Sequence, residues 1–252
     1  MKKLLNKLKS TGLLLLLMGS HLAVVAQFSD QGAITFERKT NLKQQYMTDE
    51  GNEWIKSMIN KVAPFAISEF KLVFKTDKSH YSFQKEVEVQ GLNFSWGKAA
   101  KENEVYCDFK KGSLAAKKDI YEETYFIEDS LATFVWKIED EMRTIAGFHC
   151  RKATTRICDS VVVVAFYTDE LMVSGGPEGF NGLPGMILGL AIPRLYTTWF
   201  ATHVELLPQQ VPTLRAPRKS KEVNRKGFND GLSGHFERWG KSGARILWWA
   251  AL

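Results

Sequence analysis

The stretch at residues 175–190, GGPEGFNGLPGMILGL, constrains the fold more than any other part of the chain. Its glycines permit backbone conformations that other residues avoid, and an apolar run follows them. We predict a type II β-turn at Leu183-Pro184-Gly185-Met186, approached through Gly182. Proline presets the second position of such a turn, and glycine supplies the positive φ that the third position needs. The run that follows the turn is then a short buried strand.

Segments before this stretch add a resemblance to a known family. The motif GLPGM-IL is preceded by the segments AFYT at residues 165–168 and IAGFHCRKAT at residues 145–154. Together they resemble the GLPGLI family of exported bacterial proteins, which has no established biochemical activity. The resemblance implies an exported domain with a curved antiparallel sheet, similar by analogy to periplasmic lipoprotein carriers. Cys158 and Asp159 replace the basic and glycine residues usual in the family's hairpin turn, so no turn-based function is carried over.

The first residues have the pattern of a cleavable signal peptide. Lysines at positions 2, 3, 7 and 9 form a positive segment, residues 13–18 are apolar, and Val24-Val25-Ala26 is a small-residue cleavage site. The apolar run is shorter than the roughly 18 residues that span a bilayer. We therefore expect residues 1–26 to be removed and the protein to be periplasmic or secreted. No cysteine adjoins the cleavage site, so no lipid anchor is expected.

Loss of this segment changes the charge balance. The whole chain has 34 basic and 28 acidic residues, whereas the mature chain would keep 30 basic residues against the same 28. A nearly neutral protein is not expected to bind nucleic acid. The remaining excess lies in the tail at residues 215–252, which has three interpretations. It is a solvated face, a peripheral contact with an anionic envelope surface or acidic partner, or, through Trp248 and Trp249, a cover over one end of the sheet.

Hydrophobic residues make up 44% of the chain and aromatic residues 12%, enough to fill a sizeable core. After the signal peptide we predict a GLPGLI-like antiparallel β domain at residues 27–207. Residues 208–252 then form a proline-spaced connector, up to residue 220, and a basic helical segment.

Alternation of apolar and polar residues predicts many short strands and only two helices. Expected strands lie at residues 32–38, 70–74, 80–83, 104–109, 120–126, 133–138, 145–157, 161–168, 186–190 and 196–207. Residues 161–166 are apolar at every position, which predicts burial on both faces. One helix is expected over residues 54–62 as a lid on the sheet, and another between Asn224 as its cap and Gly240 as its stop. Residues 91–104 fit either a loop or a flap laid on the sheet.

This order of elements shows no alternation of single strands and helices. We therefore predict a mainly β (α+β) fold, in which a curved antiparallel sheet or half-barrel is covered by one or two helices.

Three cysteines, Cys107, Cys150 and Cys158, allow one disulfide in an oxidising compartment. Cys158 lies too far along the hairpin from Cys150 for a direct bond between them. We predict a bridge between Cys107 and Cys150, with three unpaired thiols as the alternative.

No grouping of residues predicts a catalytic site, a cofactor or a metal. His149 and Cys150 point to opposite faces of one strand, and no zinc-binding spacing occurs. Ser174 and Ser233 lack the strand-to-helix elbow of a serine nucleophile. The glycines of the central stretch lack the lysine of a phosphate loop, and the acids at residues 139–141 lack the spacing of a calcium loop.

Two function classes remain. The first is a non-enzymatic cell-envelope protein that binds an apolar ligand such as a lipid, or a segment of an envelope-protein partner, in the concavity of its sheet. The second is a secreted hydrolase or thiol-dependent enzyme whose site is not visible in the sequence. We favour the first, because aromatic residues are abundant and no catalytic grouping emerges. The predicted cavity residues are Phe74, Phe83, Trp136, Phe166 and Trp199.

Overall fold

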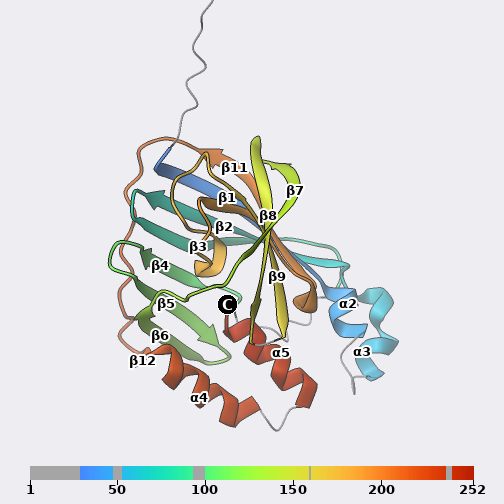
Figure 1. Ribbon diagram of the computed structural model, residues 1–252. Coiled ribbons are helices and arrows are strands. Elements are labelled where there is room, and N and C mark those ends of the chain that lie inside the picture. The colour runs from blue at the N-terminus through green and yellow to red at the C-terminus, as the bar shows by residue number, and fades with distance from the viewer. Residues whose placement is uncertain (1–28, 48–52, 93–99, 159, 237–239) are drawn as a thin grey trace, which may run out of the picture.

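A computed structural model describes the chain except for residues 1–28, 48–52, 93–99, 159 and 237–239. Its main feature is one sheet of twelve strands that curves around its own core (Figure 1). The expectation of a mainly β fold with a curved sheet and helices against it is confirmed. Within the described ranges, no helix combines the length and apolar character needed to cross a membrane. The predicted signal peptide lies outside the described residues.

The strands follow one another closely along the chain. They are β1 Gln31–Asn41, β2 Phe65–Lys75, β3 Lys78–Val87, β4 Glu104–Asp108, β5 Ser113–Ile120, β6 Glu123–Ser130, β7 Lys137–Ile145, β8 Phe148–Ile157, β9 Val161–Thr168, β10 Met186–Ile192, β11 Thr197–Glu205 and β12 Lys221–Val223. Their order in the sheet is β12-β6-β5-β4-β3-β2-β1-β11-β10-β9-β8-β7. Among these twelve strands of the described residues, the pairing of β12 with β6 is parallel and the other pairings are antiparallel.

The register places alternate large side chains on the concave face of the sheet. Phe36 of β1 lies opposite Phe70 of β2, and Arg38 of β1 lies opposite Trp199 of β11. Every second side chain of a strand points to the same face of the sheet. The inward side chains of the strands nearest the middle of the sheet therefore form one continuous core. Phe36, Phe70 and Trp199 are all fully buried there.

The helices lie at two places. The short helices α2 (Leu42–Met47) and α3 (Glu53–Ser57) and the 3₁₀ turn η1 (Ile59–Lys61) follow β1 at one end of the sheet. The lid expected over residues 54–62 is wrong, because this segment splits into two short pieces and the Trp54 side chain is 60% exposed. Helices α4 (Arg225–Phe236) and α5 (Gly240–Ala250) run along the open side of the curved sheet instead (Figure 1).

The C-terminal part of the chain contributes to the same core as the sheet. Asn224 caps α4, as expected, because its side-chain oxygen accepts a hydrogen bond of 2.8 Å from the backbone N–H of Gly227. Gly240 starts α5 rather than ending the preceding helix. Trp249 of α5 is buried, with its ring centroid 6.3 Å from that of Trp199. The tail therefore packs on the core through Trp249, as in the third interpretation, while a contact of its basic residues with an anionic surface or acidic partner stays a prediction.

Several expected strands differ in their bounds from the strands of the structure. The segment at residues 120–126 holds a turn between β5 and β6 rather than one strand, and the strand expected at residues 133–138 begins only at Lys137. The hairpin of β8 and β9 is present, although its first strand begins at Phe148 and not at Ile145, which ends β7. Val162 of β9 is nevertheless 39% exposed, so burial on both faces is wrong at this position. Near Phe166, further along β9, the outer face is covered by β7. Arg143 of β7 lies there, with its guanidinium carbon 4.5 Å from the ring centroid of Phe166.

The turn that leads into β10 has a different hydrogen bond from the one expected. The Gly185 N–H donates to the carbonyl of Leu183 over 2.8 Å, which closes a three-residue γ-turn around Pro184. The Met186 N–H donates to Leu171 instead of Leu183. The type II assignment is therefore wrong. The need for glycine remains, because Gly185 has a φ of 141° and a Cβ there would lie 2.0 Å from the carbonyl oxygen of Thr168.

We predict that Gly185→Val lowers the free energy of unfolding more than Gly112→Val does. Both glycines have positive φ, so both variants carry backbone strain of about 1–3 kcal/mol. Only Gly185 also faces a backbone clash, because nothing lies within 4 Å of a Cβ at Gly112. Urea unfolding of the two variants measures the difference. Equal losses would show that the contact with Thr168 relaxes without cost.

Candidate functional site

The candidate site is built by the long loop that connects β9 to β10. This loop turns inward across the concave face of the sheet, and residues 175–181 are buried. Its 3₁₀ turn η2 (Pro177–Gly179) carries Glu178 in a left-handed conformation with φ 56°. A Cβ on Gly179, which has a φ of 79°, would lie 3.1 Å from Val105. The glycines thus let the loop press onto the sheet, and Glu178 is carried with it into the core.

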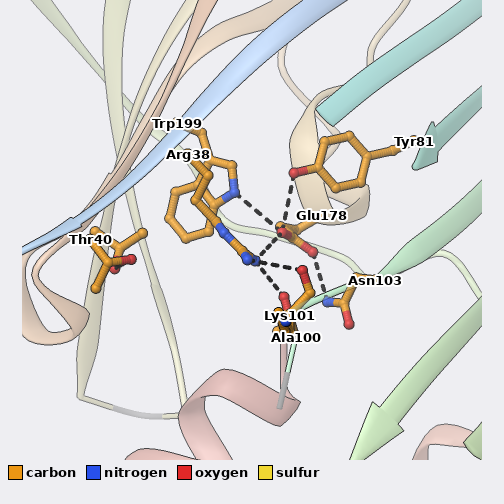
Figure 2. A network of polar contacts seen from close by, with 9 residues as sticks. Arg38, Thr40, Tyr81, Ala100, Lys101, Asn103, Glu178 and Trp199 are labelled. Carbon is orange, nitrogen blue, oxygen red and sulfur yellow. Dashed lines mark hydrogen bonds and ion pairs between the residues drawn. The ribbon is translucent and has the colours of Figure 1, made fainter. Parts of the chain in front are cut away.

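The Glu178 carboxylate accepts hydrogen bonds from three buried side chains (Figure 2). The Tyr81 hydroxyl and the Trp199 indole N–H each donate to Oε1 over 3.2 Å. The Asn103 amide donates to Oε2 over 2.8 Å. Arg38 adds an ion pair, with Nη1 3.8 Å from Oε1. Donors from three strands and a loop therefore converge on one carboxylate.

Arg38 is itself held from several directions. Its guanidinium donates to the backbone carbonyls of Ala100 and Lys101, the second over 2.9 Å. The guanidinium carbon lies 4.6 Å from the ring centroid of Phe70 and 5.8 Å from that of Trp249. Such stacking on aromatic faces stabilises a desolvated cation. Arg38 thus compensates the charge of Glu178 while its own donors are satisfied.

Burial changes the acid–base properties of this cluster. Removal from water raises the pKa of Glu178, while the positive charge of Arg38 and the hydrogen bond from Asn103 oppose that rise. Burial, followed by the nearby charge of Glu178, raises the pKa of Tyr81 well above its ordinary value. Tyr81 therefore stays protonated near neutral pH and remains a hydrogen-bond donor to the carboxylate.

A cavity of about 90 Å³ opens beside Glu178. Its walls come from β4, β5, β6 and α4, and residues 250–252 cover one side. The cavity is large enough for several water molecules, since one water needs roughly 10–15 Å³. The lining residues are Val105, Leu114, Ala116, Lys118, Ile127, Ala132, Phe134, Glu178, Gly179, Arg225, Phe228, Asn229, Ala250, Ala251 and Leu252.

Lys118 is the buried cation of this cavity. Its side chain is on β5, and its Nζ donates to the backbone carbonyl of Ala250 over 2.8 Å. Burial lowers the pKa of Lys118 to about 8. The charge of Glu178 opposes this change, and the charge of Arg225 adds to it. Near neutral pH, most of the lysine is therefore protonated inside a largely apolar wall.

The five aromatic residues predicted to line a ligand cavity do not share one face. Phe74, Phe83 and Trp199 lie on the concave face, where Phe74 and Trp199 are fully buried in the core. Phe166 pairs with Gly189, whose other neighbour is Phe200, so it lies on the outer face. Trp136 precedes β7 and donates to the carbonyl of Asn181 over 2.8 Å. The cavity beside Glu178 is lined by other residues.

The predicted disulfide is wrong. Cys107 of β4 and Cys150 of β8 are both buried free thiols, on strands separated by six others in the sheet. Burial raises the pKa of each thiol to about 12, so neither forms an appreciable thiolate near neutral pH. The described part of the chain also contains no group of three or more histidine, cysteine or acidic side chains arranged to hold a metal ion.

The sequence analysis missed Glu178, Arg38 and Lys118. A signal for the first was present, because Glu178 is the one charged residue in residues 175–190. Arg38 also falls in phase with Ile34 and Phe36, on the apolar side of the first expected strand. A charged residue on an apolar face indicates a buried pair, but neither pattern shows that the two residues meet.

The fold defines the chain as a β-rich protein, and a family model covers the part that includes this site. The model is described as "Protein of unknown function (Porph_ging)" and matches residues 154–189. These residues run from β8 through the Glu178 loop into β10. No curated protein sequence matches the chain.

Comparison with solved structures gives matches of low sequence identity. A structure of PNGF-II in one space group has a TM-score of 0.50 at 16% identity, covering 79% of this chain and 32% of that one. A second space group gives a TM-score of 0.47 at 17% identity, with 80% and 33% covered. An uncharacterized conserved protein from Thermus thermophilus gives 0.37 at 8% identity, with 79% and 93% covered. The chain spans about a third of the PNGF-II structures, and at this identity the likeness concerns the fold alone.

We predict that Arg38→Met destabilises the protein by about 3 kcal/mol at pH 8, because it leaves the Glu178 carboxylate buried without its counter-charge. The loss is expected to shrink at pH 5. The pKa of Glu178 is already raised in the folded protein and rises further without Arg38. A folded state that holds a proton more tightly than the unfolded state gains stability as the pH falls.

Urea unfolding at both pH values measures this effect. Arg143→Met, at an arginine whose side chain is 50% exposed, serves as the control and should show little change with pH. A loss for Arg38→Met that is the same at pH 5 and pH 8 would contradict the coupling to Glu178.

We also predict that the two buried thiols resist labelling until the protein unfolds. A Cys158→Ser variant leaves only Cys107 and Cys150, so the readout is simple. Without reductant, Ellman's reagent should react with neither thiol in the native protein and with both in concentrated urea. Absence of reaction in urea would mean that the two cysteines are bridged after all.

Proposed function

We propose that this chain is an exported cell-envelope protein that binds an apolar ligand in the concave side of its sheet, without catalysis. Export to the periplasm or beyond rests on the signal-peptide pattern of residues 1–26. The resemblance to the GLPGLI family supports the same placement. The family model that matches residues 154–189 describes proteins of unknown function, so it adds no activity.

The observation that carries the proposal is the cavity beside Glu178. Inward-facing side chains of adjacent strands form its wall, among them Val105 of β4, Ala116 of β5 and Ile127 of β6. Phe228 of α4 lies across from them. A mostly apolar pocket with a few converging polar groups is the usual form of a small-molecule site.

The cover over this cavity is joined to the walls by fewer backbone hydrogen bonds than the wall strands are to one another. The wall strands are joined by continuous backbone ladders, whereas the cover is the end of α5 and the residues that follow it. Two contacts hold this cover against the sheet. Lys118 of β5 donates a hydrogen bond to the carbonyl of Ala250, and Trp249 packs on Trp199 of β11. Segments held by few backbone bonds open at a lower free energy than the sheet does. Movement of residues 250–252 therefore gives a ligand a route to the cavity.

The chemistry of the buried cysteines and of Glu178 favours binding over catalysis. The raised pKa values of Cys107 and Cys150 make them poor nucleophiles, which argues against a thiol enzyme that uses either one. The Glu178 carboxylate is surrounded by the protein's own donors and Arg38. A carboxylate whose acceptor positions are occupied in this way serves to hold the structure around the cavity in place.

We expect the neutral apolar fluorophore N-phenyl-1-naphthylamine to bind the wild-type protein with increased emission. Ala116→Leu adds bulk to the cavity wall and should weaken binding about tenfold, or about 1.4 kcal/mol. Ala115→Leu is the matched control, since Ala115 is the neighbour on β5 and points to the opposite face.

Equal affinity of both leucine variants and the wild type would place the fluorophore outside the cavity and overturn the proposal. Native mass spectrometry of protein purified from cell envelopes provides a second readout. A co-purifying apolar molecule is expected, and Ala116→Leu should reduce its occupancy.

A further inference from the structure

The charges around the cavity are not balanced. Glu178 is the acidic residue of the lining, and its charge is already compensated by Arg38 and by three hydrogen-bond donors. Of the two cationic side chains in the lining, Arg225 belongs to a residue whose backbone N–H donates to the Asp129 carboxylate over 2.9 Å, so it lies beside an acidic group. The positive charge of Lys118 is the excess that remains. Even a protonated Glu178 would leave this excess of positive charge in place.

Lys118 is the more deeply placed of the two cations. It is 6% exposed, and in the described part of the chain it makes no ion pair. Its hydrogen-bond acceptor is a neutral carbonyl, that of Ala250, and its Nζ lies 5.7 Å from the ring centroid of Phe228. A buried ammonium group is costly unless an anion compensates it.

The surroundings of Lys118 also define the shape of a suitable anion. Its neighbours toward the cavity are apolar side chains such as Ala116, Ile127 and Phe228. A small hydrated anion would leave these side chains facing water or empty space. An apolar chain that ends in one anionic group satisfies both the cation and the wall.

We infer that the ligand of this site is a carboxylate-bearing amphiphile, whose carboxylate binds Lys118 in place of the Ala250 carbonyl while its apolar chain lies along β4, β5 and β6. This inference rests on the proposed function and adds the ligand class to it. The carboxylate takes over the hydrogen bond of Lys118 and supplies the missing negative charge. Residues 250–252 then move away from the cavity, because the chain of the ligand takes their place.

The experiment compares decanoate with decanol, which has the same chain length and no charge. Both are titrated calorimetrically into the wild type, Lys118→Met and Lys117→Met at pH 7, below the pKa of about 8 of Lys118. Methionine keeps most of the lysine stem and removes the buried charge, so Lys118→Met is expected to fold, which a melting curve checks. Lys117 is the matched control, since it is the next residue on β5, points to the other face and pairs with Asp119 over 3.6 Å.

We expect the wild type and Lys117→Met to bind decanoate about tenfold more tightly than decanol, about 1.4 kcal/mol. Lys118→Met should lose this preference and bind decanol as the wild type does. If both ligands bind equally in all three proteins, the carboxylate inference is wrong and apolar binding stands. If neither ligand binds the wild type, the proposed function fails together with the inference.

Discussion

The structure depends on one buried charge pair, Glu178 with Arg38. Each of these ions would be several kcal/mol less stable in the core than in water if it stood alone. Together the two ions stabilise each other, because Arg38 lies beside Glu178. The remaining hydrogen bonds of the Glu178 carboxylate come from Tyr81, Asn103 and Trp199. The requirement to satisfy these groups orients strands that are distant in the sequence and fixes the loop between β9 and β10 against the concave face.

This arrangement separates two roles that charges have in the same concavity. Glu178 and Arg38 are both satisfied by partners within the protein, so this pair serves a structural role. The charge of Lys118 is not compensated in this way, since its hydrogen-bond acceptor is the neutral backbone carbonyl of Ala250, on the segment that covers the cavity. In the binding role that we propose, Lys118 recognises the ligand through its uncompensated charge, and the compensated pair of Glu178 and Arg38 keeps the geometry of the site constant.

The sequence analysis predicted the elements that depend on local patterns. The hairpin of β8 and β9, the buried strand β10 and the capping of α4 by Asn224 all follow from residues close to one another. It failed where distant segments decide the outcome. The short strand β12 is too brief to carry an alternation of its own and exists through parallel pairing with β6. The cavity residues were also misassigned in part, because the face that Phe166 occupies depends on the register of β9 against β10 and on the direction in which the sheet curves.

The sequence by itself determined the β-rich class, the need for glycine at Gly185, and the presence of charged residues within apolar surroundings, because these properties are set by backbone sterics and by alternation along a strand. Only the tertiary structure decided that Glu178 meets Arg38, that Cys107 and Cys150 stay apart, and that Lys118 faces a cavity. Those outcomes depend on the order of strands in the sheet and on its curvature. Both arise from packing between segments far apart in the chain, and no local pattern records that packing.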